Sequence, residues 1–106
     1  MPKYLYQASY TPEGSRGLLR DGGSKRRKTV EELVEGLGGK VELFAYAFGT
    51  DDVVIVMDLP DNVTASAIAL TVNASGAVRG RVTVLVSPEE VDRAGAVRVS
   101  YTPPGK

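Results

Sequence analysis

Residues 41–59 read VELFAYAF, then GTDD, then VVIVMDL, and this stretch predicts the centre of the fold. Two runs rich in aliphatic and aromatic residues, joined by a short segment of glycine, threonine and aspartate, are typical of a β-hairpin. The second run contains no polar residue from Val53 to Met57, so we expect both of its faces to be covered. It should therefore be a central strand, with the rest of the chain packed around it.

Length and composition restrict the size and the chemistry of the protein. A chain of 106 residues forms one domain with two packed layers. Its 13 basic residues balance 13 acidic ones, so global charge attracts neither nucleic acid nor membrane. Cysteine and histidine are both absent, which excludes disulfides, thiolate sites and the usual general base and zinc ligand. With no signal-like N-terminus and no membrane-spanning run, we expect a cytoplasmic protein.

The segment before the hairpin predicts a strand followed by an interrupted helix. Alternation over Lys3–Tyr10 places Tyr4, Tyr6, Ala8 and Tyr10 on one face of a strand. Thr11 followed by Pro12 is a helix start, and the glycines near residues 21–23 predict a break, with the secure part of the helix beginning at about Ser24. Gly38 and Gly39 should end this helix, whose core-facing stripe is Val30, Leu33, Val34 and Leu37.

The segment after the hairpin predicts a helix, a strand and a short helix. Asp61 should cap a helix that runs to about Ser75, and no charge occurs from Asn62 through Val78, so we expect part of this helix to be covered. A strand follows over Val78–Val86. Ser87 and Glu90 then form a capping box that opens a helix to about Ala94.

The last residues, Ala96 to Lys106, alternate Val97, Val99 and Tyr101 with polar residues before two prolines. This alternation predicts an extra strand or an ordered arm. We expect Ala96–Tyr101 to pair with a sheet edge of a neighbouring subunit, because such pairing would protect exposed amides. The chain thus divides into a domain over residues 1–95 and an arm over residues 96–106.

The order of elements predicts an α+β protein with the ferredoxin-like βαββαβ fold. Such a fold has a four-stranded antiparallel sheet with its helices on one face, to which this chain adds a short C-terminal helix and the strand or arm. The other face must meet solvent or a partner. Because the strands carry apolar residues on both faces, we expect a second subunit to close over it.

Short motifs spread along the chain are Tyr10-Thr11, Gly14, Arg27, Gly38-Gly39-Lys40, Phe48-Gly49, Asp52, Pro60-Asp61, Ser75-Gly76-Ala77-Val78 and Pro88-Glu89-Glu90. In order and spacing they resemble the GYD-domain family over all of the chain except its arm. Asp51 stands where that family usually has tyrosine. The resemblance implies a small ferredoxin-like protein related to the dimeric α/β-barrel proteins, with no established activity.

One end of the predicted sheet gathers the residues that could bind a ligand. The ferredoxin-like order brings the hairpin turn, the start of the first helix and the start of the last strand together. We therefore expect Tyr10, Thr11, Asp51, Asp52 and Arg79 to be neighbours, with Tyr6 close by. The two aspartates could hold a metal ion or a hydroxyl group, but a hairpin turn explains glycine and aspartate here better. We assign no catalytic residue, metal or cofactor.

Three further patterns have a structural and a functional interpretation. The glycines at 14, 17, 22 and 23 could cradle a phosphate, although their spacing matches no known phosphate loop and a kinked helix is favoured. The basic run Lys25–Lys28 is typical of the wet face of a helix. The sheet tyrosines could stack RNA bases, but strand 53–58 is aliphatic and net charge is zero, so an aromatic-lined interface or pocket is favoured over nucleic-acid binding.

Two classes of function remain. The favoured one is a homo-oligomeric binding or structural module that associates through its sheet face and encloses a small organic ligand. The alternative is a cofactor-free enzyme that acts on a small organic substrate with tyrosine, aspartate and arginine. The first is preferred because no nucleophile and base of the usual kinds can be paired in this sequence.

Overall fold

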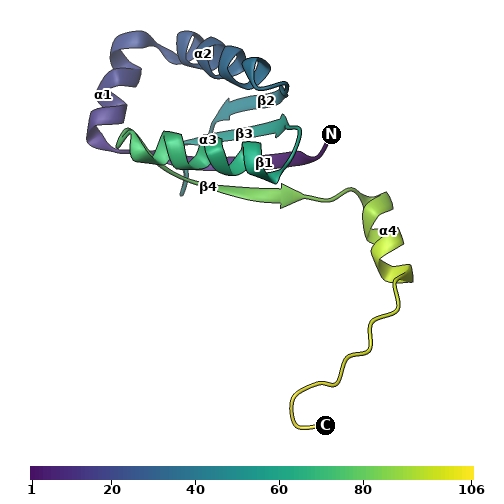
Figure 1. The fold of residues 1–106 in the computed structure, drawn as a ribbon. Coiled ribbons are helices and arrows are strands. Elements are labelled where there is room, and N and C mark those ends of the chain that lie inside the picture. Colours follow the sequence, from purple (N-terminus) through teal and green to yellow (C-terminus); the bar gives the residue numbers. More distant parts are fainter.

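The computed structural model describes residues 1–106 and shows an α+β protein with a four-stranded antiparallel sheet and four helices (Figure 1). The elements in chain order are β1 (Lys3–Tyr10), α1 (Pro12–Asp21), α2 (Gly23–Gly36), β2 (Lys40–Tyr46), β3 (Val53–Asp58), α3 (Asn62–Ala74), β4 (Val78–Leu85) and α4 (Pro88–Ala96).

The strand order across the sheet is β2-β3-β1-β4, and every neighbouring pair is antiparallel. The central position predicted for β3 is confirmed. Its register pairs Ile55 with Tyr6 of β1 on one side and with Phe44 of β2 on the other. The ladder between β2 and β3 shifts between Val41 and Leu43, which marks a bulge in the edge strand. Both β2 and β4 are therefore edge strands with one unpaired side.

Helices α1, α2 and α3 lie on one face of the sheet (Figure 1). On that face the alternating residues of the two central strands are buried, as the tyrosine alternation in β1 predicts. Helix α2 packs over β2 and α3 packs over β4. The buried core consists of Tyr4, Tyr6, Ala8, Val34, Val53, Ile55, Met57, Leu59, Ala65, Ile68 and Val78. Residues that alternate with these on the strands lie on the other face, which we call the helix-free face.

Sequence reasoning overestimated the apolar stripe of α2. Val34 is buried and Val30 packs against the core, but Leu33 and Leu37 are 43% and 45% exposed. Leu37 follows the last residue of the helix, so it is no longer in helical register. Leu33 faces a cavity between the helices and the sheet that no other side chain fills.

The first helical region is two helices rather than one. The Thr11 side chain accepts a hydrogen bond from the Gly14 amide, 3.1 Å away, which confirms it as the N-cap of α1. Gly22 has a φ of 85° and separates α1 from α2, within the predicted break. Because α1 is a complete helix and α4 follows β4, the order β-α-α-β-β-α-β-α differs in detail from the simple ferredoxin-like order.

The C-terminal part extends away from the body of the domain (Figure 1). Helix α4 begins with the predicted capping box, in which Ser87 and Glu90 each accept from the other's backbone amide. Residues 97–106 then form no strand and pair with no edge of their own sheet. The radius of gyration is 16.9 Å, against about 13 Å for a compact domain of this length. No helix has the length and apolar character needed to cross a membrane.

Candidate functional site

The hairpin loop at residues 47–52 is longer than the sequence indicates, because β2 ends at Tyr46 and not at Phe48. The Ala47 amide donates to the Asp52 carbonyl at 3.0 Å, and the chain beyond Ala47 turns out of the ladder. Phe48 takes a φ of 50°, a left-handed conformation that few residues other than glycine adopt. Its ring stacks on that of Tyr46, with centroids 5.9 Å apart. The loop therefore projects beyond the sheet end where β1 finishes and β4 begins.

Asp52 attaches the hairpin loop to the end of β1. Its carboxylate Oδ2 accepts a hydrogen bond from the Tyr10 amide at 2.9 Å. Its own amide donates to the Ala8 carbonyl at the same distance. The side chain thus continues the ladder between β1 and β3 where the two backbones separate, which is a structural role.

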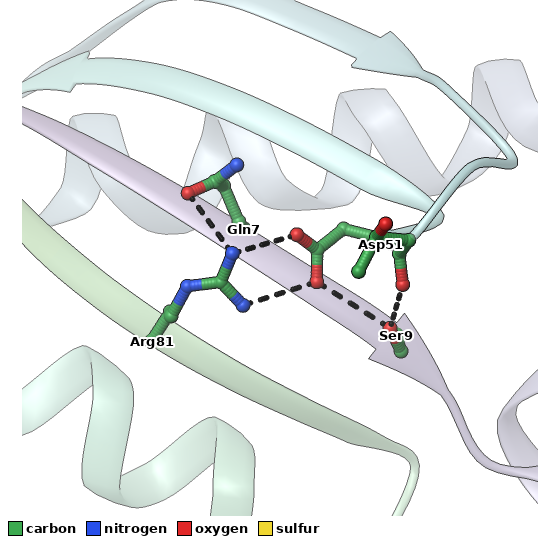
Figure 2. A network of polar contacts seen from close by, with 5 residues as sticks. Gln7, Ser9, Asp51 and Arg81 are labelled. Carbon is green, nitrogen blue, oxygen red and sulfur yellow. Dashed lines mark hydrogen bonds and ion pairs between the residues drawn. The ribbon is translucent and has the colours of Figure 1, made fainter.

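Asp51 is the centre of a polar network on the helix-free face (Figure 2). The Arg81 guanidinium binds it through both nitrogens, with Nη2 to Oδ2 at 2.8 Å and Nη1 to Oδ1 at 3.2 Å. Arg81 Nη2 also donates to Gln7 Oε1 at 3.4 Å, and Ser9 Oγ donates to the Thr50 carbonyl at 3.2 Å. The Asp51 side chain is only 12% exposed, whereas that of Arg81 is 58% exposed. This bidentate contact orients the guanidinium and the carboxylate, and it leaves one side of the guanidinium open to solvent.

The arginine that pairs with this carboxylate is Arg81, and not the predicted Arg79. Both residues point to the helix-free face, but the register sets Arg79 opposite Ser9 and Arg81 opposite Gln7. Arg79 is exposed and borders a hollow of about 270 Å³ at the sheet end, together with Thr11 and Pro12. Which arginine meets Asp51 depends on the register of β1 with β4, which the sequence does not contain.

The six predicted site residues lie at or near one end of the sheet but on both of its faces. Tyr6 and Tyr10 are on the helix side, whereas Asp51 and Arg79 are on the helix-free face. The Thr11 hydroxyl accepts a hydrogen bond from the Gly14 amide at the start of α1 and donates one to the Gly76 carbonyl at 2.8 Å. The sheet thus separates the set into two places, and no single pocket contains all six.

Asn73 of α3 is a structural residue that sequence reasoning missed. Its carboxamide accepts from the Gly80 amide at 3.0 Å and donates to the Gly80 carbonyl at 3.1 Å, as a neighbouring strand would. Its oxygen also accepts from the Tyr6 hydroxyl at 3.3 Å. A side chain at Gly80 would overlap the Tyr6 ring, so glycine is required there. An asparagine five residues before an arginine-containing strand carries no signal of this contact.

Two tyrosines on the helix side, Tyr6 and Tyr10, have raised pKa values. Burial raises the pKa of Tyr6. Burial and, to a smaller extent, the neighbouring Tyr46 hydroxyl raise the pKa of Tyr10 to about 12. Both phenols therefore stay protonated under physiological conditions. No group of three or more acidic side chains is close enough to share a metal ion.

A family model described as the GYD domain matches residues 4–94 of the chain. The protein belongs to the GYD-domain family. No curated protein and no solved structure gives a significant match. In this GYD-domain protein the match begins inside β1, includes the other three strands and ends inside α4, so residues 95–106 lie outside it.

Proposed function

We propose that this GYD-domain protein is a ferredoxin-like, homo-oligomeric binding module whose subunits associate through their helix-free faces. The observation that carries the proposal is an apolar row across the centre of that face. The register aligns Leu43 of β2 with Val56 of β3, and Val56 with Leu5 of β1. Nothing within the chain covers this row, although residues 53–57 of β3 are all apolar, which is typical of a strand buried on both faces.

Polar clusters border the apolar row at both ends of the sheet. At one end Lys3 Nζ bonds Glu42 at 2.7 Å and Asp58 at 2.8 Å. At the other end is the Asp51–Arg81 pair with Gln7. Each charged group of these two clusters has a partner of opposite sign within its own subunit, so a second copy can approach without leaving any of them unpaired. An apolar centre with a polar rim is the usual anatomy of a protein interface.

The accessible surface supports association as well. The chain exposes 7360 Å², whereas a compact monomer of 11.3 kDa exposes about 5,700 Å². The excess is about twice the roughly 800 Å² that each partner buries in a standard interface. Part of it comes from α4 and the arm, which extend away from the domain. The occupant that we propose for this face is another copy of the same chain, because its apolar row and paired charges can meet the same row and rim on a second subunit.

The arm is the second element proposed to contact a neighbouring subunit. Val97, Val99 and Tyr101 are 64%, 75% and 71% exposed in the isolated chain. A groove that could take these apolar side chains lies beside the free edge of β4. Leu70 and Val84 in its lining are 73% and 52% exposed. We propose that residues 96–101 pair with this edge in a second copy. Their alternate apolar side chains would then fill the groove.

The molar mass in solution tests the sheet-face contact. We expect light scattering at micromolar concentration to give a multiple of 11.3 kDa. Val56→Lys places a charge in the middle of the apolar row and should dissociate the assembly without changing the circular dichroism spectrum. Leu19→Lys is the matched control, because Leu19 on α1 is 86% exposed and lies on the helix side. A native protein of 11.3 kDa, or a Val56→Lys protein with the native mass, contradicts the proposal.

Removing the arm tests the second contact separately. Deletion of residues 96–106 should reduce the assembly constant or the solubility while the core keeps its unfolding cooperativity. A truncated protein that keeps the same number of subunits and the same melting temperature would show that the arm is a simple tail.

A further inference from the structure

The helix side of the sheet holds an apolar cavity that the self-association proposal does not use. Its volume is about 60 Å³, and 13 of its 14 lining residues are hydrophobic. Ile55 and Met57 of β3 form part of the floor, Val34 of α2 one wall and Ile68 of α3 the other. The cavity exists because α2 packs over β2 and α3 packs over β4, so the two central strands lie beneath the space between the helices.

The cavity adjoins a larger and more polar cleft. This outer cleft has a volume of about 310 Å³ and lies among α1, α2 and α3, with Gly14 and Gly17 in its lining. Tyr10, Arg26, Val72 and Val78 line both spaces, so they form the passage between them. The two spaces together make one site with an apolar inner end and a polar outer end.

The passage presents hydrogen-bond donors and one positive charge. The Tyr10 hydroxyl lies in the passage and, like any phenol near neutral pH, carries a proton that it can donate. Arg26 forms no ion pair within the chain and is always charged. The acidic residues Glu13 and Asp21 line only the outer cleft, so Arg26 is the one charged group next to the apolar cavity. A group that accepts hydrogen bonds and carries a negative charge suits this passage.

We propose that this site binds a small amphipathic organic acid, with its apolar end in the inner cavity and its carboxylate beside Arg26 and Tyr10. The inner cavity of about 60 Å³ is less than half of the roughly 150 Å³ that holds a benzene ring, so it takes the last carbons of a short aliphatic chain and the rest of the chain lies in the passage. The assignment names the ligand of the proposed binding module, but it does not depend on the assembly. The cavity and the helix-free face lie on opposite sides of the sheet.

Titration of the full-length protein with hexanoate, followed by amide chemical shifts, tests the assignment. The uncharged hexan-1-ol has the same chain and serves as the comparison ligand. We expect hexanoate to shift amides of α2 and β1 and to bind about tenfold more tightly than hexanol, because the guanidinium recognises only the carboxylate. Arg26→Gln should bring hexanoate affinity down to that of hexanol. Arg27→Gln is the control, since Arg27 is exposed and lines neither space.

Three results would overturn the assignment: no binding of either ligand at millimolar concentration, equal losses in the two arginine variants, or shifts confined to residues outside the site. A cavity-filling variant, Val72→Phe, should abolish binding of both ligands while the protein stays folded by circular dichroism. If that variant unfolds, the Arg26 comparison decides alone. The mass measured in the same samples separates the two proposals. A monomer that binds hexanoate refutes only self-association, and an oligomer that fails to bind refutes only this site.

Discussion

Replacing Asn73 by alanine should destabilise the protein by about 2 kcal/mol, which is a large part of the stability of a small domain. The change removes two bonds to the Gly80 backbone at the exposed edge of β4, each contributing about 0.5 kcal/mol because water can replace them. It also leaves the Tyr6 hydroxyl without its acceptor, and Tyr6 is 5% exposed. An unpaired hydroxyl at such a position costs about 1 kcal/mol or more.

A double-mutant cycle with Tyr6→Phe isolates that last contribution. Tyr6→Phe alone should cost about 1 kcal/mol, and the double variant should be about 1 kcal/mol more stable than additivity predicts, because it has no hydroxyl to leave unpaired. Urea unfolding at one fixed protomer concentration is the assay, since assembly would make stability depend on concentration. Additive effects, or a loss below about 0.5 kcal/mol in Asn73→Ala, would refute the stabilising role of the Asn73 contacts.

The other predictions concern a core residue, an ion pair and a helix cap. Leu59→Ala should lower the free energy of unfolding by about 2–5 kcal/mol in urea melts, because Leu59 is fully buried; a smaller loss would mean that the core collapses around the gap. Asp51→Ala should cost at most about 1 kcal/mol at low salt and less at high salt, because its partner Arg81 is more than half exposed. Hydrogen bonds from the backbone and hydroxyl of Thr64 lower the pKa of Asp61. The contribution of Asp61 to folding stability is therefore present above its unfolded-state pKa and is lost as the pH falls through its folded-state pKa. Asp61→Asn should therefore flatten the acid side of the curve of stability against pH, and an unchanged acid slope would contradict this cap.

The parts of the fold that follow from local sequence patterns were predictable. Two-residue alternation located β1 and its buried tyrosine face, and the apolar run at 53–57 located the central strand. Caps at Thr11, Asp61 and Ser87 marked three helix starts, because each side chain satisfies amides only a few residues away.

The parts that depend on contacts between distant segments were not predictable. The choice of Arg81 over Arg79 as the partner of Asp51 follows from the register of β1 with β4. The contact of Asn73 with Gly80 depends on where α3 crosses β4. The cavity that leaves Leu33 partly exposed depends on the separation of α2 and α3. In the observed register of β1 with β4, strand alternation places Tyr6 and Arg79 on different faces of the sheet. Without knowledge of that register, the sequence does not predict this separation.

Thiol labelling at Thr83 tests most directly whether a second copy covers the helix-free face. The chain has no cysteine, so Thr83→Cys introduces a single thiol next to the apolar row, at a position that is exposed in the isolated subunit. Ser15→Cys on α1, also exposed, gives a matched thiol on the helix side. If two helix-free faces meet, the thiol at position 83 should react with an alkylating reagent at least about tenfold more slowly than the one at position 15, and equally fast after unfolding. Equal rates in the native protein would contradict the account.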